Sequence, residues 1–452
     1  MTIYYKDTFF LPRLLSLVIP IILQGLLTSS LNFIDVFMIG QLGETAVAAV
    51  GSVNQFMFVF LMLAFGLSSG TAIFTAQYWG AKQLTQIKTV MGLGLLLTLC
   101  VSVVFTMVTM LIPGFFISPF TNDPHVLQAG IPYLKIIAPT FIMTGLTFLF
   151  ASVLRSTENV VFPMSASIIG IVMNTGLNYL LIFGKLGFPE LGITGAAIAT
   201  LIARIIETGL VIFLTYYKKS PAALTFQHMF SYNWELFKKY LQKTLPIVGQ
   251  SVLWALGFSV YSMVYGHLEH NSTGSLAAFN ISGTIERICL VFFTSLGGAC
   301  SIMVGNRIGA NEENKARGYA KNFLVIALLL SVVISVILFL LRSTVVDIYK
   351  LTDDSKTYIM GILLFMSLIM WAKASNIVFH MGIFKAGGDT LFSMFVDVGG
   401  VWLIGVPIAL IAGFVIKLPV HYIVACLMIE DIVKMAAAYF RFLSGKWLNN
   451  LI

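Results

Sequence analysis

The sequence predicts an all-α membrane protein of twelve transmembrane helices, arranged as two pseudo-symmetric lobes of six helices each. Of its 452 residues, 58% are hydrophobic and only 10% are charged, whereas soluble domains carry roughly 25% charged residues. Stretches 45–81 and 89–122 contain no Asp, Glu, Lys or Arg. Each is longer than the ~20 apolar residues that cross a bilayer. The third observation is an internal repeat.

Loops with charged residues, proline or glycine divide the apolar sequence into twelve predicted spans. These are 14–38, 47–77, 88–112, 128–152, 161–184, 190–216, 239–267, 275–304, 318–341, 357–384, 392–416 and 420–443. Six spans lie on each side of the longest loop. We therefore expect an N-terminal lobe at 1–216, a cytoplasmic linker at 217–238 and a C-terminal lobe at 239–452.

The two halves resemble each other at a nearly constant spacing. PIILQ at 20–24 is followed in the second half by PIVGQ at 246–250, and Pro189 by Pro419. Because each half has an even number of spans, both halves enter the membrane from the same side, as in a parallel repeat. Two such lobes suit transport by alternating access, although a duplication without transport gives the same pattern.

Basic residues indicate the orientation. With the N-terminus inside, most of the 27 Lys and Arg residues fall in cytoplasmic segments, as the positive-inside rule requires. We expect a multi-pass protein of the cell's inner (cytoplasmic) membrane with both termini cytoplasmic. Although the net charge is +8, no basic run with interleaved aromatics occurs, which argues against nucleic acid as a partner. The four cysteines lack metal-ligand spacing, so neither a metal site nor a disulfide framework is expected.

Polar residues inside the first lobe form the candidate cation or proton site. Asp35 is the only acid in this set, and a carboxylate at a helix centre costs about 2.5–3.5 kcal/mol in insertion scales. Asn174 and Asn178 share one face of the fifth span because they are four residues apart. Asn54 and Gln55 of the second span are expected at a similar depth. A carboxyl group facing interfacial water, and asparagines that only join helices, remain alternatives.

The second lobe differs, because Tyr261 occupies the position that matches Asp35. Its polar candidates for substrate contact or support are Gln250, Ser251, His380 and Asp397, with Gln24 in the first lobe. His380 titrates near physiological pH when unperturbed, but an interior histidine with satisfied hydrogen bonds is equally compatible. Pro20 and Pro246 remove backbone donors and are candidate bending points, or residues of a tolerant first turn.

Several segments resemble the multidrug and toxic compound extrusion (MATE) transporters. These are LNFIDVFMIGQLGETAVAAVG at 31–51, GIVMNTGLNYLLIFG at 170–184, GITGAAIATLIAR at 192–204, VGNRIGA at 304–310 and FKAGGDT at 384–390. The resemblance spans nearly the whole chain. It implies export coupled to inward flow of H+ or Na+, with Asp35, Asn174 and Asn178 as the cation site.

The chain departs from part of that family. Some members carry acids in helices seven and ten, where this sequence has Gln250, Ser251 and Trp254, and no acid between Thr357 and Phe384. This pattern resembles the DinF-like branch and favours proton coupling through Asp35. Some relatives have Asp at the position of Asn178, so the number of ions exchanged stays open.

The sequence thus predicts a monomeric antiporter of drug-like, cationic or amphipathic small molecules in the lipid bilayer. It requires no cofactor besides the coupling ion. A flippase for lipid-linked or polysaccharide precursors is the alternative transporter. No spacing of a metal site, a Ser/His/Asp set or a phosphate-binding glycine loop suggests an enzyme.

Overall fold

The computed structural model describes residues 7–119, 121, 123–268, 272–347 and 352–452, and every regular element within them is helical. The elements are α1 (Phe10–Gly40), α2 (Glu44–Gly80), α3 (Leu84–Leu111), α4 (Pro113–Ile117), α5 (Pro124–Ile137), α6 (Thr140–Ser156), α7 (Val161–Phe183), η1 (Lys185–Gly187), α8 (Gly192–Tyr217), η2 (Phe226–Met229), α9 (Trp234–Gly266), α10 (Ser272–Gly309), α11 (Glu313–Asp347), α12 (Asp353–Ile377), η3 (Val378–Phe384), α13 (Thr390–Gly399), η4 (Gly400–Gly405), α14 (Val406–Leu410), η5 (Ile411–Val415) and α15 (Val420–Ser444).

Ten helices of the described chain are long and apolar enough to cross a membrane. The pair α5 and α6 is bent by 48° at the break between the two helices, and it makes an eleventh span if both helices cross the membrane as one. The sequence predicts one helix at 128–152 here. The break falls at Pro139, a residue that cannot donate a backbone hydrogen bond.

The twelfth predicted span is α15. Its 25 residues extend about 37 Å at 1.5 Å per residue, which exceeds a hydrocarbon core of about 30 Å. Glu430, Asp431 and Lys434 interrupt its apolar sequence, so it differs in composition from the other ten single helices. The buried positions of Glu430 and Lys434 show that this charged face packs inside the protein.

The chain forms two compact units, Ile19–Val248 and a second made of Met1–Val18 with Gly249–Ile452. The boundaries run through α1 and α9, whereas the sequence places the division in the loop 217–238. Pro20 lies two residues from the boundary in α1, and Pro246 two residues from that in α9. The first part of each of these helices therefore packs with the other half of the sequence.

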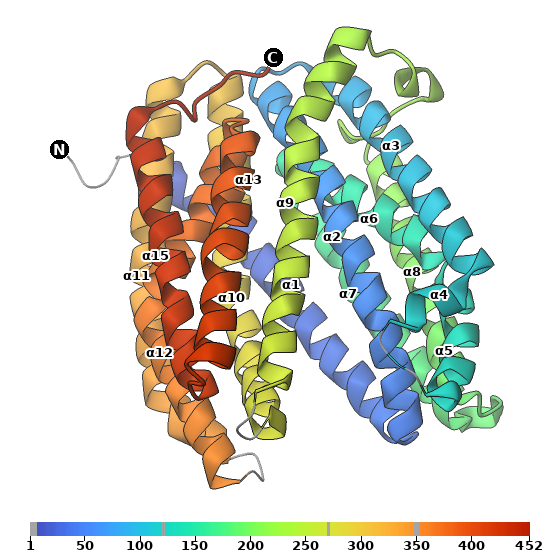
Figure 1. Cartoon of the computed structure of the whole chain (residues 1–452). Helices are drawn as coiled ribbons and strands as arrows, with labels where there is room; N and C mark the ends of the chain where they lie inside the picture. The colour runs from blue at the N-terminus through green and yellow to red at the C-terminus, as the bar shows by residue number, and fades with distance from the viewer. Residues whose placement is uncertain (1–6, 120, 122, 269–271, 348–351) are drawn as a thin grey trace. The chain divides into compact units, whose positions relative to one another are not determined.

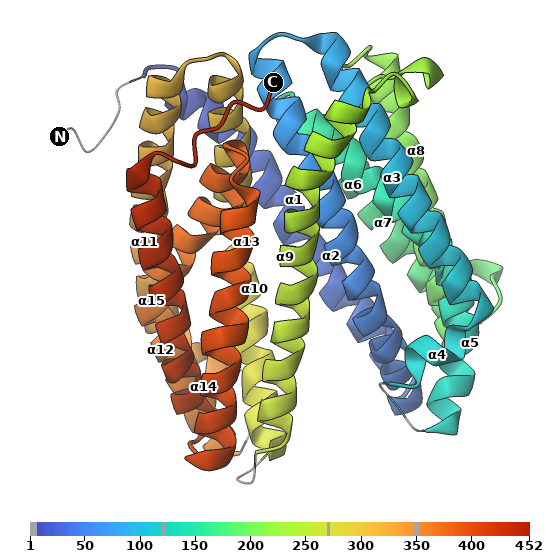
Figure 2. The same cartoon turned by 45° about the horizontal axis from the view of Figure 1, so that its top comes forward.

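Each unit has its own apolar core. Stacked and tilted phenylalanine pairs occupy the first unit, with Phe56 and Phe105 centroids 4.9 Å apart and Phe60 and Phe141 4.7 Å apart. In the second unit, α11, α12 and α15 lie side by side in both views (Figures 1 and 2). The polar residues described below lie between helices of one unit.

The start of α1 is fixed to the second unit. Phe10 is fully buried, and its ring lies 4.9 Å from Tyr319 and 5.4 Å from Phe323. The Tyr319 hydroxyl donates a hydrogen bond of 2.6 Å to Asp7. This hydrogen bond, with the backbone N–H of Phe9 and the charge of Arg307, lowers the pKa of Asp7 below its usual value.

Candidate cation site

Asp35 and Asn178 are in direct contact. The Asn178 Nδ2 donates a hydrogen bond of 2.8 Å to Asp35 Oδ1 and another of 3.2 Å to Asn174 Oδ1. Asn174 in turn donates to the Thr200 hydroxyl over 3.3 Å. The structure thus brings together the three predicted residues and adds Thr200, in a chain from α1 through α7 to α8.

The local sequence explains this geometry. Asn174 and Asn178 are one helical turn apart on α7, so their side chains lie on the same face. That face packs against α8, where Gly195 allows a close approach: a Cβ there would lie 2.4 Å from the Leu181 carbonyl oxygen. Asn174 and Asn178 are 5% and 2% exposed, whereas Asp35 is partly exposed. The two amides are therefore more deeply buried than the aspartate that they contact.

One buried oxygen of this site has no hydrogen-bond partner among the described residues. It is Asn178 Oδ1, on the same amide that donates to Asp35. Leaving a buried acceptor unpaired costs about 1–3 kcal/mol. A protonated carboxyl group or a cation beside Asp35 would supply what this oxygen lacks.

A second polar chain crosses the same unit. Arg155 donates to Gln24 Oε1 over 2.8 Å, Gln24 donates to Ser167 over 2.7 Å, and Ser167 donates to Glu207 over 2.7 Å. Arg204 and Glu207 form an ion pair of 2.8 Å. Gln24, predicted as a support residue, is therefore the junction between α1, α6 and α7.

Glu207 is a second buried acid of this unit, which the sequence analysis did not single out, and it belongs to the polar chain of Gln24 and not to that of Asp35. Glu207 is 6% exposed and interacts with Arg204, three residues earlier on the same helix. The sequence does carry a signal for this residue: Glu207 follows Arg204 by three positions within an apolar run, a spacing that allows an ion pair on one helix. Arg204 forms its ion pair with Glu207, and no described basic side chain forms an ion pair with Asp35.

Asn54 and Gln55 do not join the site. Both are exposed on α2, and neither forms a side-chain hydrogen bond with Asp35, Asn174 or Asn178. Their depth in the membrane stays a prediction. Proximity along the membrane normal says nothing about the direction in which a side chain points.

The second unit contains a network of charged and polar groups. Lys434 contacts Asp397 Oδ1 at 3.1 Å and Glu430 Oε1 at 2.8 Å. Gln250 donates to the other Asp397 oxygen over 2.9 Å, and the Tyr261 hydroxyl donates to Glu430 over 2.7 Å. Three predicted residues, Gln250, Tyr261 and Asp397, thus meet two that were missed.

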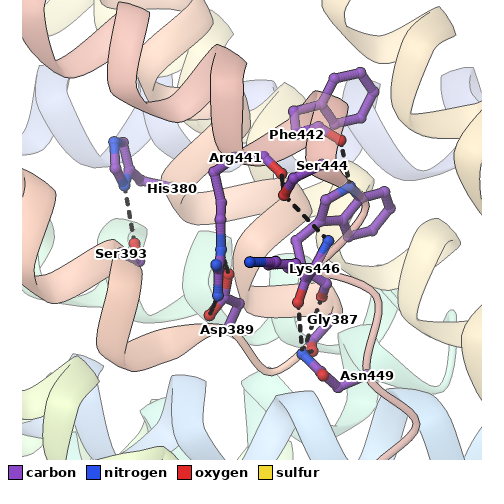
Figure 3. A network of polar contacts seen from close by, with 10 residues as sticks. His380, Gly387, Asp389, Ser393, Arg441, Phe442, Ser444, Lys446 and Asn449 are labelled. Atoms are coloured by element: carbon purple, nitrogen blue, oxygen red, sulfur yellow. Dashed lines mark hydrogen bonds and ion pairs between the residues drawn. The ribbon is translucent and has the colours of Figure 1, made fainter.

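His380 lies next to this network. Its Nδ1 is 2.9 Å from the Ser393 hydroxyl, which donates to Gln250 Oε1 at 3.5 Å. Figure 3 shows His380 and Ser393 near the bidentate Arg441–Asp389 ion pair, with distances of 2.7 and 3.0 Å. Ser251 is partly buried. Within the described residues, no cluster of His, Cys, Asp and Glu has the geometry of a metal site.

Together, the helical fold and the buried polar chains define a multi-pass membrane protein with polar groups in its interior. The chain belongs to the MATE family of transporters: the MatE family model matches residues 20–180 and again 246–411. The two matches fall in the two halves of the repeat. The members of this family are transporters and not enzymes.

Curated relatives cover most of the chain. It is 26% identical to a probable multidrug resistance protein YoeA of Bacillus subtilis over 404 residues, covering 89% of this chain and 87% of the relative. It is 22% identical to a probable multidrug resistance protein NorM of Thermotoga maritima, covering 96% and 92%.

Solved structures share the fold. An outward-facing MATE family transporter of the MOP superfamily superposes with a TM-score of 0.86 at 18% identity, covering 98% of this chain and all of that one. The predicted all-helical, two-lobe fold class is confirmed.

Proposed function

We propose that this protein is a secondary active multidrug exporter that exchanges H+ or Na+ for amphipathic or cationic small molecules. The family supports transport, and the relatives named as multidrug resistance proteins support the substrate class. The observation that carries the coupling is the Asp35–Asn178 contact, with a buried amide oxygen left unpaired beside a partly exposed carboxyl group.

The chemistry of this contact suits ion exchange. When Asp35 is ionised, it accepts from Asn178 Nδ2. When it carries a proton, its hydroxyl can donate to an amide oxygen, and when it holds Na+, the ion requires oxygen ligands that Asn178 and Asn174 possess. The coupling ion therefore takes the place of the hydrogen-bond partner that the amide oxygen of Asn178 lacks. Its release restores the negative charge of Asp35.

Alternating access requires helices that bend or rotate. Pro20 and Pro246 each leave a backbone carbonyl without its helical partner, and both lie beside the boundaries of the compact units. We therefore assign the bending of α1 and α9 to these prolines. Occupation of Asp35, on α1, would then bias the conformation of the helix that Pro20 divides.

A flippase for anionic lipid-linked precursors would need several uncompensated basic side chains. In the first unit, Arg204 is paired with Glu207 and Arg155 is bonded to Gln24. These partners make a site for an anionic headgroup less suitable than one for a cation.

The direct test uses efflux of ethidium from proteoliposomes under an imposed pH gradient or an imposed sodium gradient. We expect one of these gradients to drive uphill efflux, and Asp35→Asn to abolish it while the protein remains monodisperse. Glu44→Gln, which changes an exposed acid of the same unit, is the matched control. Normal gradient-driven efflux by the Asp35→Asn protein would refute the mechanism.

A further inference from the structure

The ion pair of Arg204 and Glu207 begins one helical turn from the polar chain of Asp35. Thr200, which ends that chain, precedes Arg204 by four residues on α8, so the two side chains lie on one face of the helix, about 6 Å apart along its axis. Glu207 follows after three more residues, and its carboxylate contacts Arg204 at 2.8 Å. Along α8, Arg204 therefore lies between the polar chain of Asp35 and its own counter-charge.

The carboxylate of Glu207 is held from two sides. Its Oε2 contacts Arg204, and its Oε1 accepts a hydrogen bond of 2.7 Å from the Ser167 hydroxyl. Ser167 in turn accepts from Gln24. Close packing of α7 adds to this restraint, because a Cβ at Gly170 would lie 3.1 Å from the Glu207 Cβ. The buried negative charge of Glu207 thus has a fixed place in this unit.

Arg204 acts on Asp35 without touching it. No ion pair joins the two among the described residues, but the charge of the guanidinium group reaches the carboxyl group through space. A further titratable neighbour of Asp35 is Tyr133 of α5, whose phenol is uncharged at neutral pH. On the other side, Arg155 of α6 interacts through space with Glu207.

The sign of each charge decides its effect on a cation bound at Asp35. The guanidinium group of Arg204 repels a proton or a sodium ion there, because like charges disfavour each other. The carboxylate of Glu207 offsets this repulsion while it stays beside Arg204. The field at Asp35 therefore depends on both members of the ion pair.

We propose that the Arg204–Glu207 ion pair sets the affinity of Asp35 for the coupling cation, with Arg204 weakening the binding and Glu207 opposing Arg204. This inference rests on the proposed function, because it requires that Asp35 takes up the ion. The pair supplies no ligand and acts through its charge. An intermediate affinity suits an antiporter, which has to bind and release the ion in every cycle.

The experiment measures cation affinity on purified full-length protein, independently of transport. One arm records ²²Na+ binding isotherms at pH 8, and the other records proton uptake between pH 9 and pH 5 in sodium-free buffer. Each protein is compared with the same protein carrying Asp35→Asn, so that the difference reports this carboxyl group. The variants are Glu207→Gln, Arg204→Gln, the double variant, Arg204→Lys and Lys218→Gln, which changes an exposed base at the end of α8.

We expect opposite shifts for the two members of the pair. Glu207→Gln leaves the charge of Arg204 unopposed and should weaken cation binding about three- to tenfold, seen as a higher sodium Kd or as half-saturation with protons at lower pH. Arg204→Gln should strengthen binding by a similar factor. The double variant should fall between the single variants, and Arg204→Lys and Lys218→Gln should match the wild type.

A purely structural role of the ion pair predicts a different result, because either single substitution breaks the same contact and would shift the affinity in the same direction. Shifts of equal sign, or wild-type affinities in both single variants, would overturn the inference and leave the proposed function standing. If Asp35→Asn binds as many cations as the wild type in both arms, the proposed function and the inference fail together. Should Glu207→Gln not fold, Arg204→Gln has to bind the cation more tightly than Arg204→Lys, and equal affinities would contradict the inference.

Discussion

The Tyr261 hydroxyl donates a hydrogen bond of 2.7 Å to Glu430 Oε2, and the backbone at Gly405 passes directly beside this bond. A Cβ at Gly405 would lie 2.0 Å from the tyrosine oxygen and 2.2 Å from the carboxylate oxygen. Gly405 ends the π-helical segment η4. The missing side chain at this position thus lets Tyr261 of α9 and Glu430 of α15 form their hydrogen bond beside η4.

Gly405→Ala should separate Tyr261 from Glu430. We expect a loss of about 1–3 kcal/mol in stability, which is typical of added volume in a packed interior, measured as a lower midpoint of thermal unfolding in detergent. Gly399→Ala is the control, because its nearest neighbour, a Leu403 methyl group, lies at 4.0 Å. Equal midpoints for the two variants would show that the helices adjust without breaking the bond.

Asn178→Leu should reduce gradient-driven ethidium efflux at least about tenfold. A hydrogen bond to a charged group contributes about 1.5–3 kcal/mol, and 1.4 kcal/mol corresponds to a factor of ten. Thr200→Val removes only the neutral acceptor of Asn174 at 3.3 Å and should have a smaller effect. If Thr200→Val were the more damaging change, the central role of Asn178 would be wrong.

Glu207→Gln should destabilise the first unit without removing the coupling carboxyl group. The substitution removes the charge that pairs with Arg204 and weakens the acceptor for Ser167, at an expected cost of about 1–3 kcal/mol. Thermal unfolding of Glu207→Gln, of Arg204→Gln and of the double variant would measure the coupling between the two side chains. Strictly additive effects would show that the ion pair contributes little.

Tyr319→Phe should alter how the start of α1 responds to acid. In the wild type the pKa of Asp7 is lowered mainly by the Tyr319 hydroxyl, so the stabilisation is present above the unfolded value of 3.8 and is lost as the pH falls through the lower folded value. Without the hydroxyl the pKa should return toward 3.8. Hydrogen exchange at residues 8–14 should then increase at a higher pH than in the wild type, and identical pH profiles would contradict this.

The spans were predictable because hydropathy over about 20 residues reflects the solvent around a helix. The bend between α5 and α6 was less predictable from the sequence, because Pro139 permits a kink without fixing its angle. The partners of buried charges were harder still. Lys434 reaches Glu430 on its own helix, a spacing that can be read from the sequence, but its contact with Asp397 depends on which helix packs beside α15.

Glu207 and Asp431 illustrate the same limit. Glu207 is held by Ser167, forty residues earlier in the chain, and the Asp431 carbonyl accepts from Asn376, 55 residues earlier. Neither relation has a local spacing. In contrast, Asn174 and Asn178 could be assigned to one face because helical periodicity alone aligns them.

The packing of Phe10 against Tyr319 and Phe323 also affects how the protein is made. The start of α1 is synthesised about three hundred residues before α11. The burial site for Phe10 therefore does not exist while the first half is being inserted. Phe10 lacks this packing until the second half has been synthesised. A chain truncated before α11 would leave this aromatic side chain without its pocket, however well the first six spans had assembled.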